Sequence, residues 1–172
     1  MFQILDSYPR RVYALMALTC IGLLAFGLYL QHEVGLEPCP MCIVQRYLFV
    51  LVALLALAAA SWPARRAAVV LGGVIVVLAG AGAFVAARQS WLQWYPPEVF
   101  TCGRDLYGMI EAFPLQRVIP MVFKGSGDCS AVDWTFLGGS IANWSFVCFC
   151  VCGVGAALLA WRQGRLAPAV QE

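Results

Sequence analysis

The amino-acid sequence predicts an all-α membrane protein folded as a bundle of four transmembrane helices. Hydrophobic residues make up 62% of the 172-residue chain and charged residues only 12%, although charged residues form about a quarter of an ordinary soluble domain. Four apolar runs are each long enough to cross a bilayer core, which takes about 20 helical residues. We therefore expect a single integral membrane domain in contact with lipid.

The four expected spans are residues 12–30, 43–62, 67–87 and 143–161, and Arg46 is the only charged residue in any of them. The first run is too long for the roughly 7–15-residue core of a cleavable signal peptide, so we expect it to be retained. Carboxylates inside the membrane, which are typical of ion and proton transporters, do not occur in these runs. No basic run indicates a nucleic-acid partner.

Basic residues between the spans predict the orientation. The short loop at residues 31–38 holds no Lys or Arg, whereas arginines flank the spans on the other side at positions 10, 11, 65, 66, 162 and 165. Short loops rich in Lys and Arg stay in the cytoplasm. We therefore expect both termini and the turn at residues 62–66 to be cytoplasmic, and the loops at residues 31–42 and 88–142 to face outward.

The long outward loop contains an apolar stretch, Phe113–Phe123, that Arg117 and two prolines interrupt. This stretch is too short to span the bilayer. It predicts a short amphipathic segment on the outer membrane surface. A loop with a small core of its own is an equally good interpretation.

Eight cysteines divide by position into two groups. An oxidising compartment permits disulfides in the outward loops, and four cysteines fall in or beside these loops: Cys39, Cys42, Cys102 and Cys129. The other four fall inside the first and fourth spans: Cys20, Cys148, Cys150 and Cys152. We expect these in-span cysteines to pack as small hydrophobic residues.

The stretch Cys39-Pro40-Met41-Cys42 stands where the first outward loop meets the second span. Proline suits the first turn of a helix, so the helix is expected to begin near Pro40 with Cys42 in its first turn. The positive end of the helix dipole favours a thiolate there. Arg46 follows four residues later on the same helix face, about 6 Å along the axis, and is expected to favour the thiolate as well.

A pair of cysteines at this spacing has three common uses, and the residues alone leave all three open. A structural bridge across two residues closes a very small loop and stabilises little. A zinc site needs four ligands in a tetrahedral array, which Cys102 and Cys129 could complete in number but not in the usual spacing. Redox chemistry explains more, because a thiolate is the attacking species in disulfide exchange. Arg46 is then a functional candidate, although an arginine whose head reaches the membrane interface is the alternative.

The chain resembles the DsbB family of bacterial inner-membrane disulfide bond formation proteins over nearly its whole length. A lone pair of cysteines would be a weak signal, whereas an ordered set of motifs is a strong one. The set comprises Glu37-Pro38-Cys39-Pro40-Met41-Cys42, Gln45-Arg46, Leu92-Gln93-Trp94-Tyr95-Pro96, Phe100-Thr101-Cys102, residues 118–123, Ser126-Gly127-Asp128-Cys129 and Trp134-Thr135-Phe136-Leu137-Gly138.

The resemblance implies a thiol:quinone oxidoreductase of the bacterial inner membrane, with its outward loops in the periplasm. Cys102 and Cys129 would exchange with a DsbA-like periplasmic oxidase and pass electrons to Cys39 and Cys42. A membrane quinone, ubiquinone or menaquinone, would take the electrons beside Cys42, with Arg46 binding its oxygen. No metal is implied. The alternative is a four-span membrane protein whose outer loops carry static structural disulfides.

Two positions depart from the pattern of some family members. Those members carry an acidic residue before the arginine and a histidine before the aromatic residues of the second loop, whereas this chain has Gln45 and Gln89. Any part that the family residues play in quinone binding or proton handling must be met differently here. A vitamin K epoxide reductase-like protein is a further alternative, but the alternating spacing of Cys148, Cys150 and Cys152 argues against it.

Overall fold

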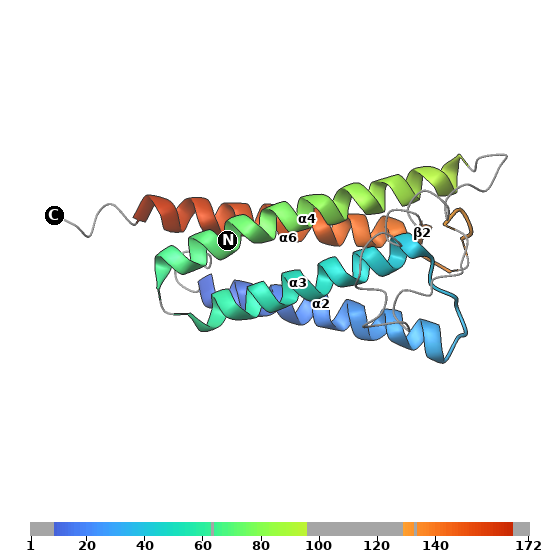
Figure 1. Ribbon diagram of the computed structural model, residues 1–172, viewed down its shortest axis with the longest axis horizontal. Coiled ribbons are helices and arrows are strands. Elements are labelled where there is room, and N and C mark those ends of the chain that lie inside the picture. Colours follow the sequence, from blue (N-terminus) through green and yellow to red (C-terminus); the bar gives the residue numbers. More distant parts are fainter. Residues whose placement is uncertain (1–8, 63, 96–128, 133, 167–172) are drawn as a thin grey trace, which may run out of the picture.

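The structure is a computed structural model that describes residues 9–62, 64–95, 129–132 and 134–166. It contains four long helices and one short antiparallel hairpin: α2 (Pro9–His32), α3 (Pro40–Ser61), α4 (Arg65–Trp94), β1 (Thr135–Phe136), β2 (Gly139–Ser140) and α6 (Ile141–Leu166). The helices run lengthwise beside one another, with α2 and α3 on one side and α4 and α6 on the other (Figure 1). All four are long and apolar enough to cross a membrane, so the predicted fold class is confirmed.

Helix ends follow from local sequence. Pro40 occupies the first turn of α3, and Cys39 is its N-cap residue, as the proline predicts. Helix α4 continues through residues 88–94, so the predicted start of the long loop at residue 88 is wrong. The hydropathy falls at Arg88, but nothing breaks the helix before Pro96-Pro97, and the residue before a proline leaves the helical region. Hydropathy therefore located the span but not the end of the helix.

Small residues line the inside of the bundle with a regular spacing. The buried positions of α4 alternate in steps of four and three residues: Ala68, Gly72, Ile75, Ala79, Gly82, Ala86 and Gln89. Helix α3 follows the same steps at Gln45, Phe49, Val52, Ala56 and Ala59. An average step of 3.5 residues is typical of left-handed helix packing. Ala87 is exposed and Ala86 is buried, because the stripe does not advance by four residues at every step.

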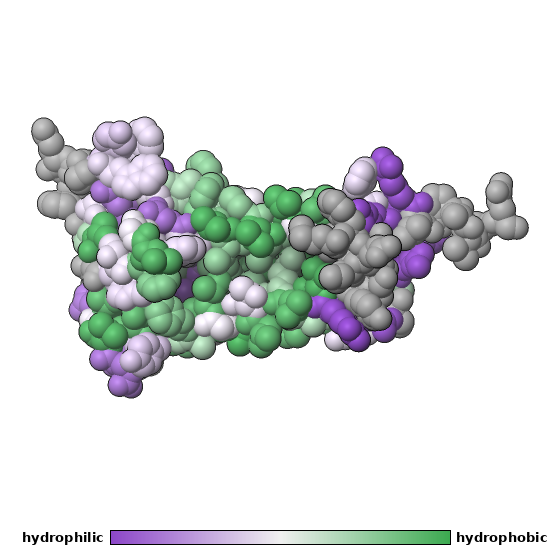
Figure 2. Space-filling model, turned by 180° about the vertical axis from the view of Figure 1, so that it is seen from behind, coloured by the Kyte–Doolittle hydropathy of each residue, from purple (hydrophilic) through white to green (hydrophobic). Residues whose placement is uncertain are grey.

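Many large apolar side chains face outward. Val77 and Phe84 on α4 are 71% and 74% exposed, and Leu18 on α2 is 66% exposed. Figure 2 shows a hydrophobic region across the middle of one face of the molecule, with more hydrophilic residues towards its ends. This arrangement suits a bundle in lipid, where small residues allow the helices to approach and large ones meet the acyl chains.

The centre of the bundle is a stacked aromatic pair. The rings of Phe49 on α3 and Phe149 on α6 lie nearly parallel with centroids 3.9 Å apart. Gly82 on α4 makes room for them, because a Cβ at this position would lie 2.4 Å from the Phe149 ring. Near the end of the bundle where α2 and α4 both begin, Tyr13 on α2 donates a hydrogen bond to the Ala68 carbonyl at 3.3 Å. These contacts join helices that are distant in the sequence.

A β-hairpin, which we did not predict, precedes α6. Its two-residue turn places both Leu137 and Gly138 at positive φ, as the tight turns that connect antiparallel strands require. Trp144 donates to the Phe136 carbonyl at 2.9 Å, and Ser140 donates to Gln93 of α4 at 2.6 Å. The hairpin is thereby attached to the ends of both α4 and α6. Cys102 and the predicted amphipathic segment at residues 113–123 lie outside the described residues.

Candidate thiol–disulfide exchange site

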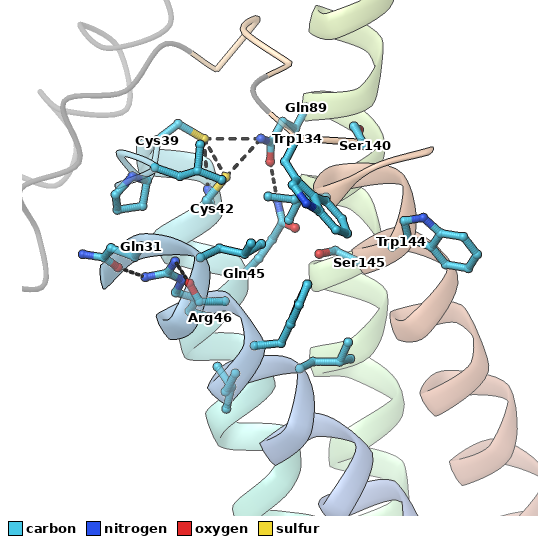
Figure 3. A pocket seen from close by; sticks show the side chains of 18 of the residues that line it. Gln31, Cys39, Cys42, Gln45, Arg46, Gln89, Trp134, Ser140, Trp144 and Ser145 are labelled. Carbon is cyan, nitrogen blue, oxygen red and sulfur yellow. Dashed lines mark hydrogen bonds between the residues drawn. The ribbon is translucent and has the colours of Figure 1, made fainter. Parts of the chain in front are cut away.

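Cys39 and Cys42 lie at the start of α3, at the end of the bundle that carries the hairpin (Figures 1 and 3). Both are free thiols, and their sulfur atoms are 2.9 Å apart. The Cys39 sulfur accepts a hydrogen bond from the backbone N–H of Cys42 at 3.3 Å and so caps the helix. The predicted position of Cys42 in the first turn of this helix is the observed one.

Cys129 joins this pair from the far side of the long loop. Its side chain is buried and packs in one apolar cluster with Cys39, Met41 and Leu92. Hydrogen bonding with Cys129 and then with Cys42, together with burial, raises the pKa of Cys39 above its ordinary value. Cys39 therefore keeps its proton at neutral pH. Three of the four predicted site cysteines come together, and the fourth, Cys102, lies outside the described residues.

Two buried glutamines form a chain of hydrogen bonds that leads to the sulfur atoms (Figure 3). The Gln89 side-chain amide donates to Cys42 Sγ at 3.1 Å and to Cys39 Sγ at 3.3 Å. Gln45 Nε2 in turn donates to Gln89 Oε1 at 2.6 Å. The sequence marked these residues only as departures and did not predict that Gln89 contacts the thiols or that Gln45 contacts Gln89. The signal was available, because the buried stripes of α3 and α4 reach Gln45 and Gln89 when extended towards this end.

Arg46 extends from α3 across to α2. Its Nη2 donates to the Gly27 carbonyl at 3.1 Å, and its Nη1 donates to Gln31 Oε1. The side-chain donors recorded at the Cys42 sulfur are Cys39 and Gln89. From outside the Cys39–Cys42 pair, the side-chain hydrogen bond to the Cys42 sulfur in the described part of the chain comes from an amide on α4. The expectation that the charge of Arg46 favours a thiolate on Cys42 stays a prediction. The long arginine side chain instead reaches polar atoms on the next helix.

A cavity of about 300 Å³ lies beside the thiols, and Cys39, Cys42, Arg46 and Gln89 line part of its wall. All four helices contribute to its wall, and it lies where α2 and α6 leave room by making few contacts with each other. The rest of the wall is mostly apolar and includes Phe26 and Trp134, whose rings meet edge to face at 5.4 Å. An apolar cavity with a few polar groups at one end is typical of a site for a small, mainly apolar molecule.

The cysteines inside the spans lie apart from the thiol cluster of Cys39, Cys42 and Cys129, although one of them lines the cavity. Cys20 and Cys152 are buried in the core with their sulfur atoms 4.0 Å apart. Cys148 is half-buried and lines the cavity, which the sequence pattern did not predict. Among the described residues, no group of three or more His, Cys, Asp or Glu side chains could hold a metal ion.

Four membrane-length helices and a cluster of free thiols beside an apolar cavity define a multi-pass membrane protein equipped for thiol–disulfide exchange. The family model described as disulfide bond formation protein DsbB matches residues 9–159. Disulfide bond formation protein B of Polaromonas naphthalenivorans is 67% identical over 165 residues, which cover 96% of this chain and 99% of the relative. The corresponding protein of Albidiferax ferrireducens is 65% identical over 162 residues, covering 92% and 91% of the two chains.

The chain therefore belongs to the DsbB family, and the resemblance drawn from its motifs is confirmed. Membership assigns it a role in disulfide bond formation and the chemistry of a disulfide oxidoreductase.

Proposed function

We propose that this protein is a thiol:quinone oxidoreductase that reoxidises a DsbA-like periplasmic dithiol oxidase. The observation that carries the proposal is the meeting of Cys39 with two neighbours: Cys129, which comes from the long loop, and a cavity suited to an apolar molecule. Electrons can pass between thiols only where sulfur atoms come into contact. The Cys39–Cys42 pair thus connects a loop that can meet a protein partner with a space open to a lipid-soluble one.

The exchange steps follow from thiol chemistry. A thiolate of the reduced partner attacks Cys102 of a Cys102–Cys129 disulfide, which forms a mixed disulfide and releases Cys129 as a thiolate. The second thiol of the partner then displaces Cys102, and the partner leaves oxidised. Cys129 attacks Cys39 of the Cys39–Cys42 disulfide, so that a Cys39–Cys129 disulfide forms and the electron pair of the broken bond goes to Cys42. Cys102 then attacks Cys129, which restores the Cys102–Cys129 disulfide and releases Cys39, so that Cys39 and Cys42 are both reduced and can give two electrons to an acceptor. The contact between Cys129 and Cys39 supports this order.

The cavity fits a quinone by the chemistry of its wall. Its apolar side chains suit a lipid-soluble ring, and Arg46 supplies a cation at the polar end. A guanidinium carries five N–H donors, and the bonds to Gln31 and Gly27 use two of them. Arg46 would hold a carbonyl oxygen with the others, and Cys42 would face the ring. A quinone, when bound, supplies a two-electron acceptor.

The need for such an acceptor follows from redox potentials. DsbA is among the most oxidising dithiol proteins, with a potential of about −120 mV, so ordinary thiol couples cannot reoxidise it. Ubiquinone and menaquinone are the candidate acceptors that dissolve in the membrane. Reaching them from a periplasmic thiol requires a site at the membrane surface, which agrees with the position of the thiols at the start of α3.

The location proposed is the bacterial inner membrane, with both termini in the cytoplasm. The thiols lie at one end of the bundle, whereas the arginine pair of the α3–α4 turn and the end of α6 lie at the other (Figure 1). The rule that basic residues stay inside supports this orientation.

The experiment that tests the function uses purified protein with reduced DsbA and a quinone, and follows the redox state of both. We expect DsbA to be oxidised while the quinone is reduced in equal amount. In the absence of a quinone, reduced DsbA should still reduce the Cys39–Cys42 disulfide. A pair that stays oxidised under this condition would support static structural disulfides instead.

A further inference from the structure

The two glutamines beside the thiols form an ordered chain of donors and acceptors. Gln45 on α3 and Gln89 on α4 are each 3% exposed, and their side chains meet across the buried faces of the two helices. A buried side-chain amide is stable when both its oxygen and its nitrogen have hydrogen-bond partners. Gln89 meets this condition, because its oxygen accepts from Gln45 and its nitrogen donates to both sulfur atoms.

The direction of these bonds depends on Gln45. A glutamine amide carries an acceptor on one side and donors on the other, and a flip exchanges them. The Gln45 N–H group donates to the Gln89 oxygen. The Gln89 Nε2 group therefore points the other way and is free to donate to Cys42. A reversed Gln89 would turn a carbonyl oxygen towards sulfur, where it would repel a thiolate.

We propose that Gln89 is a further catalytic residue, whose amide stabilises the thiolate formed on Cys42, and that Gln45 is a positioning residue that holds this amide in the required direction. The proposal deepens the proposed function and rests on it. When Cys129 attacks Cys39, one disulfide forms and another breaks, and the electron pair remains on Cys42 without a proton. A donated N–H group 3.1 Å from that sulfur stabilises the new charge.

Arg46 does not take this role in the structure. Its recorded hydrogen bonds go to Gly27 and Gln31 on α2. The amide and the guanidinium thus have separate tasks, the amide at the sulfur and the guanidinium at the cavity wall.

The test measures the alkylation rate of Cys42 in the reduced full-length protein in detergent. Iodoacetamide reacts with thiolates, and mass spectrometry of the Cys42 peptide separates this residue from the other cysteines. Gln89→Met keeps the length of the side chain and removes the donor. We expect it to slow alkylation at pH 7 by about fivefold or more, as the loss of a charge-assisted hydrogen bond requires.

Gln45→Glu is the sharper variant because it preserves shape. A carboxylate can only accept, so it would take the Gln89 N–H group and turn the Gln89 oxygen to Cys42. We expect slowing at least as large as that in Gln89→Met. If the methionine variant does not fold, as judged by circular dichroism and gel filtration, this variant carries the test alone.

Gln163→Met is the matched control, since Gln163 is a buried glutamine near the opposite end of α6. Its alkylation rate should equal that of the unmodified chain. Control-like rates in both site variants would overturn the proposal, and a control-like rate in Gln45→Glu alone would refute the positioning role of Gln45.

The assay needs neither DsbA nor quinone. Slowed alkylation in a protein without quinone-dependent turnover would therefore refute the proposed function and leave the amide contact intact. Normal turnover with unchanged alkylation in the site variants would refute only the role of the amides.

Discussion

Arg46 of α3 donates a hydrogen bond to the backbone carbonyl of Gly27 on α2 at 3.1 Å, and this contact fixes its guanidinium at the wall of the cavity. An arginine that merely reached for the membrane interface would have no need of a partner on the neighbouring helix. The second bond, to Gln31, holds the same group from the end of α2 (Figure 3). The cation thus has a defined position on the side of the cavity where Cys42 lies.

Arg46→Ala should raise the apparent KM for quinone by about tenfold, as the loss of one hydrogen bond from a charged group implies, and should change the KM for DsbA much less. Steady-state kinetics with each substrate varied in turn would measure both. Gln31→Leu should act in the same direction but more weakly, because it frees the guanidinium without removing it. Arg165→Ala, near the far end of α6, serves as the control. An effect of Arg46→Ala confined to the protein substrate would contradict its place in the quinone site.

Cys42→Ser should abolish electron transfer to quinone, because the electron pair released from the Cys39–Cys42 disulfide then has no sulfur to receive it. Cys102 should still form a mixed disulfide with DsbA, visible on a non-reducing gel. Quinone reduction would be followed by its absorbance. Turnover equal to that of the unmodified protein would refute the role given to Cys42.

The alkylation of Cys39 should remain slow from pH 7 to pH 9. Hydrogen bonding with Cys129 and Cys42 raises its pKa, so the thiol form persists as the pH rises through the range in which an ordinary cysteine ionises, near about 8.5. Cys129→Ser weakens the largest cause of this shift and should speed the reaction at pH 8. Rapid alkylation of Cys39 in the unmodified protein at pH 7 would show that the contact does not hold in solution.

Gly82→Ala should destabilise the bundle by about 1–3 kcal/mol, the usual cost of overpacking, because its methyl group would lie 2.4 Å from the Phe149 ring. Gly80→Ala is the matched control, since nothing lies within 4 Å of the Cβ position there. Thermal unfolding in detergent would compare the two variants. Equal stability would mean that Phe149 does not stack on Phe49 as the structure has it.

Replacement of Cys148, Cys150 and Cys152 by alanine together should leave kcat within about twofold of normal, since buried cysteine packs as a small hydrophobe. The KM for quinone is the more sensitive measurement, because Cys148 lines the cavity. A large loss of kcat would show that these thiols take part in electron transfer.

The helices and the start of α3 could be predicted because both are decided locally. A run of about 20 apolar residues enters a membrane whatever its neighbours are, and Pro40 sets a helix start through its own geometry. The end of α4 at Trp94 was missed because polarity marks the edge of a membrane and not the end of a helix. The hairpin before α6 was missed because its tight turn contains Leu137 at positive φ, a residue without preference for that conformation.

The amino-acid sequence alone was thus sufficient to identify four spans, two groups of thiols and the family resemblance. Only the packed bundle determined that Cys129 lies against Cys39, that Gln89 reaches both sulfur atoms, and that α2 and α6 leave a cavity between them. The reason is that hydropathy and capping act along one segment of chain. Contacts between segments depend on how each helix is rotated about its axis and on how closely its small residues let it approach the next helix. Both depend on the packing free energy of the whole bundle and not on any one helix.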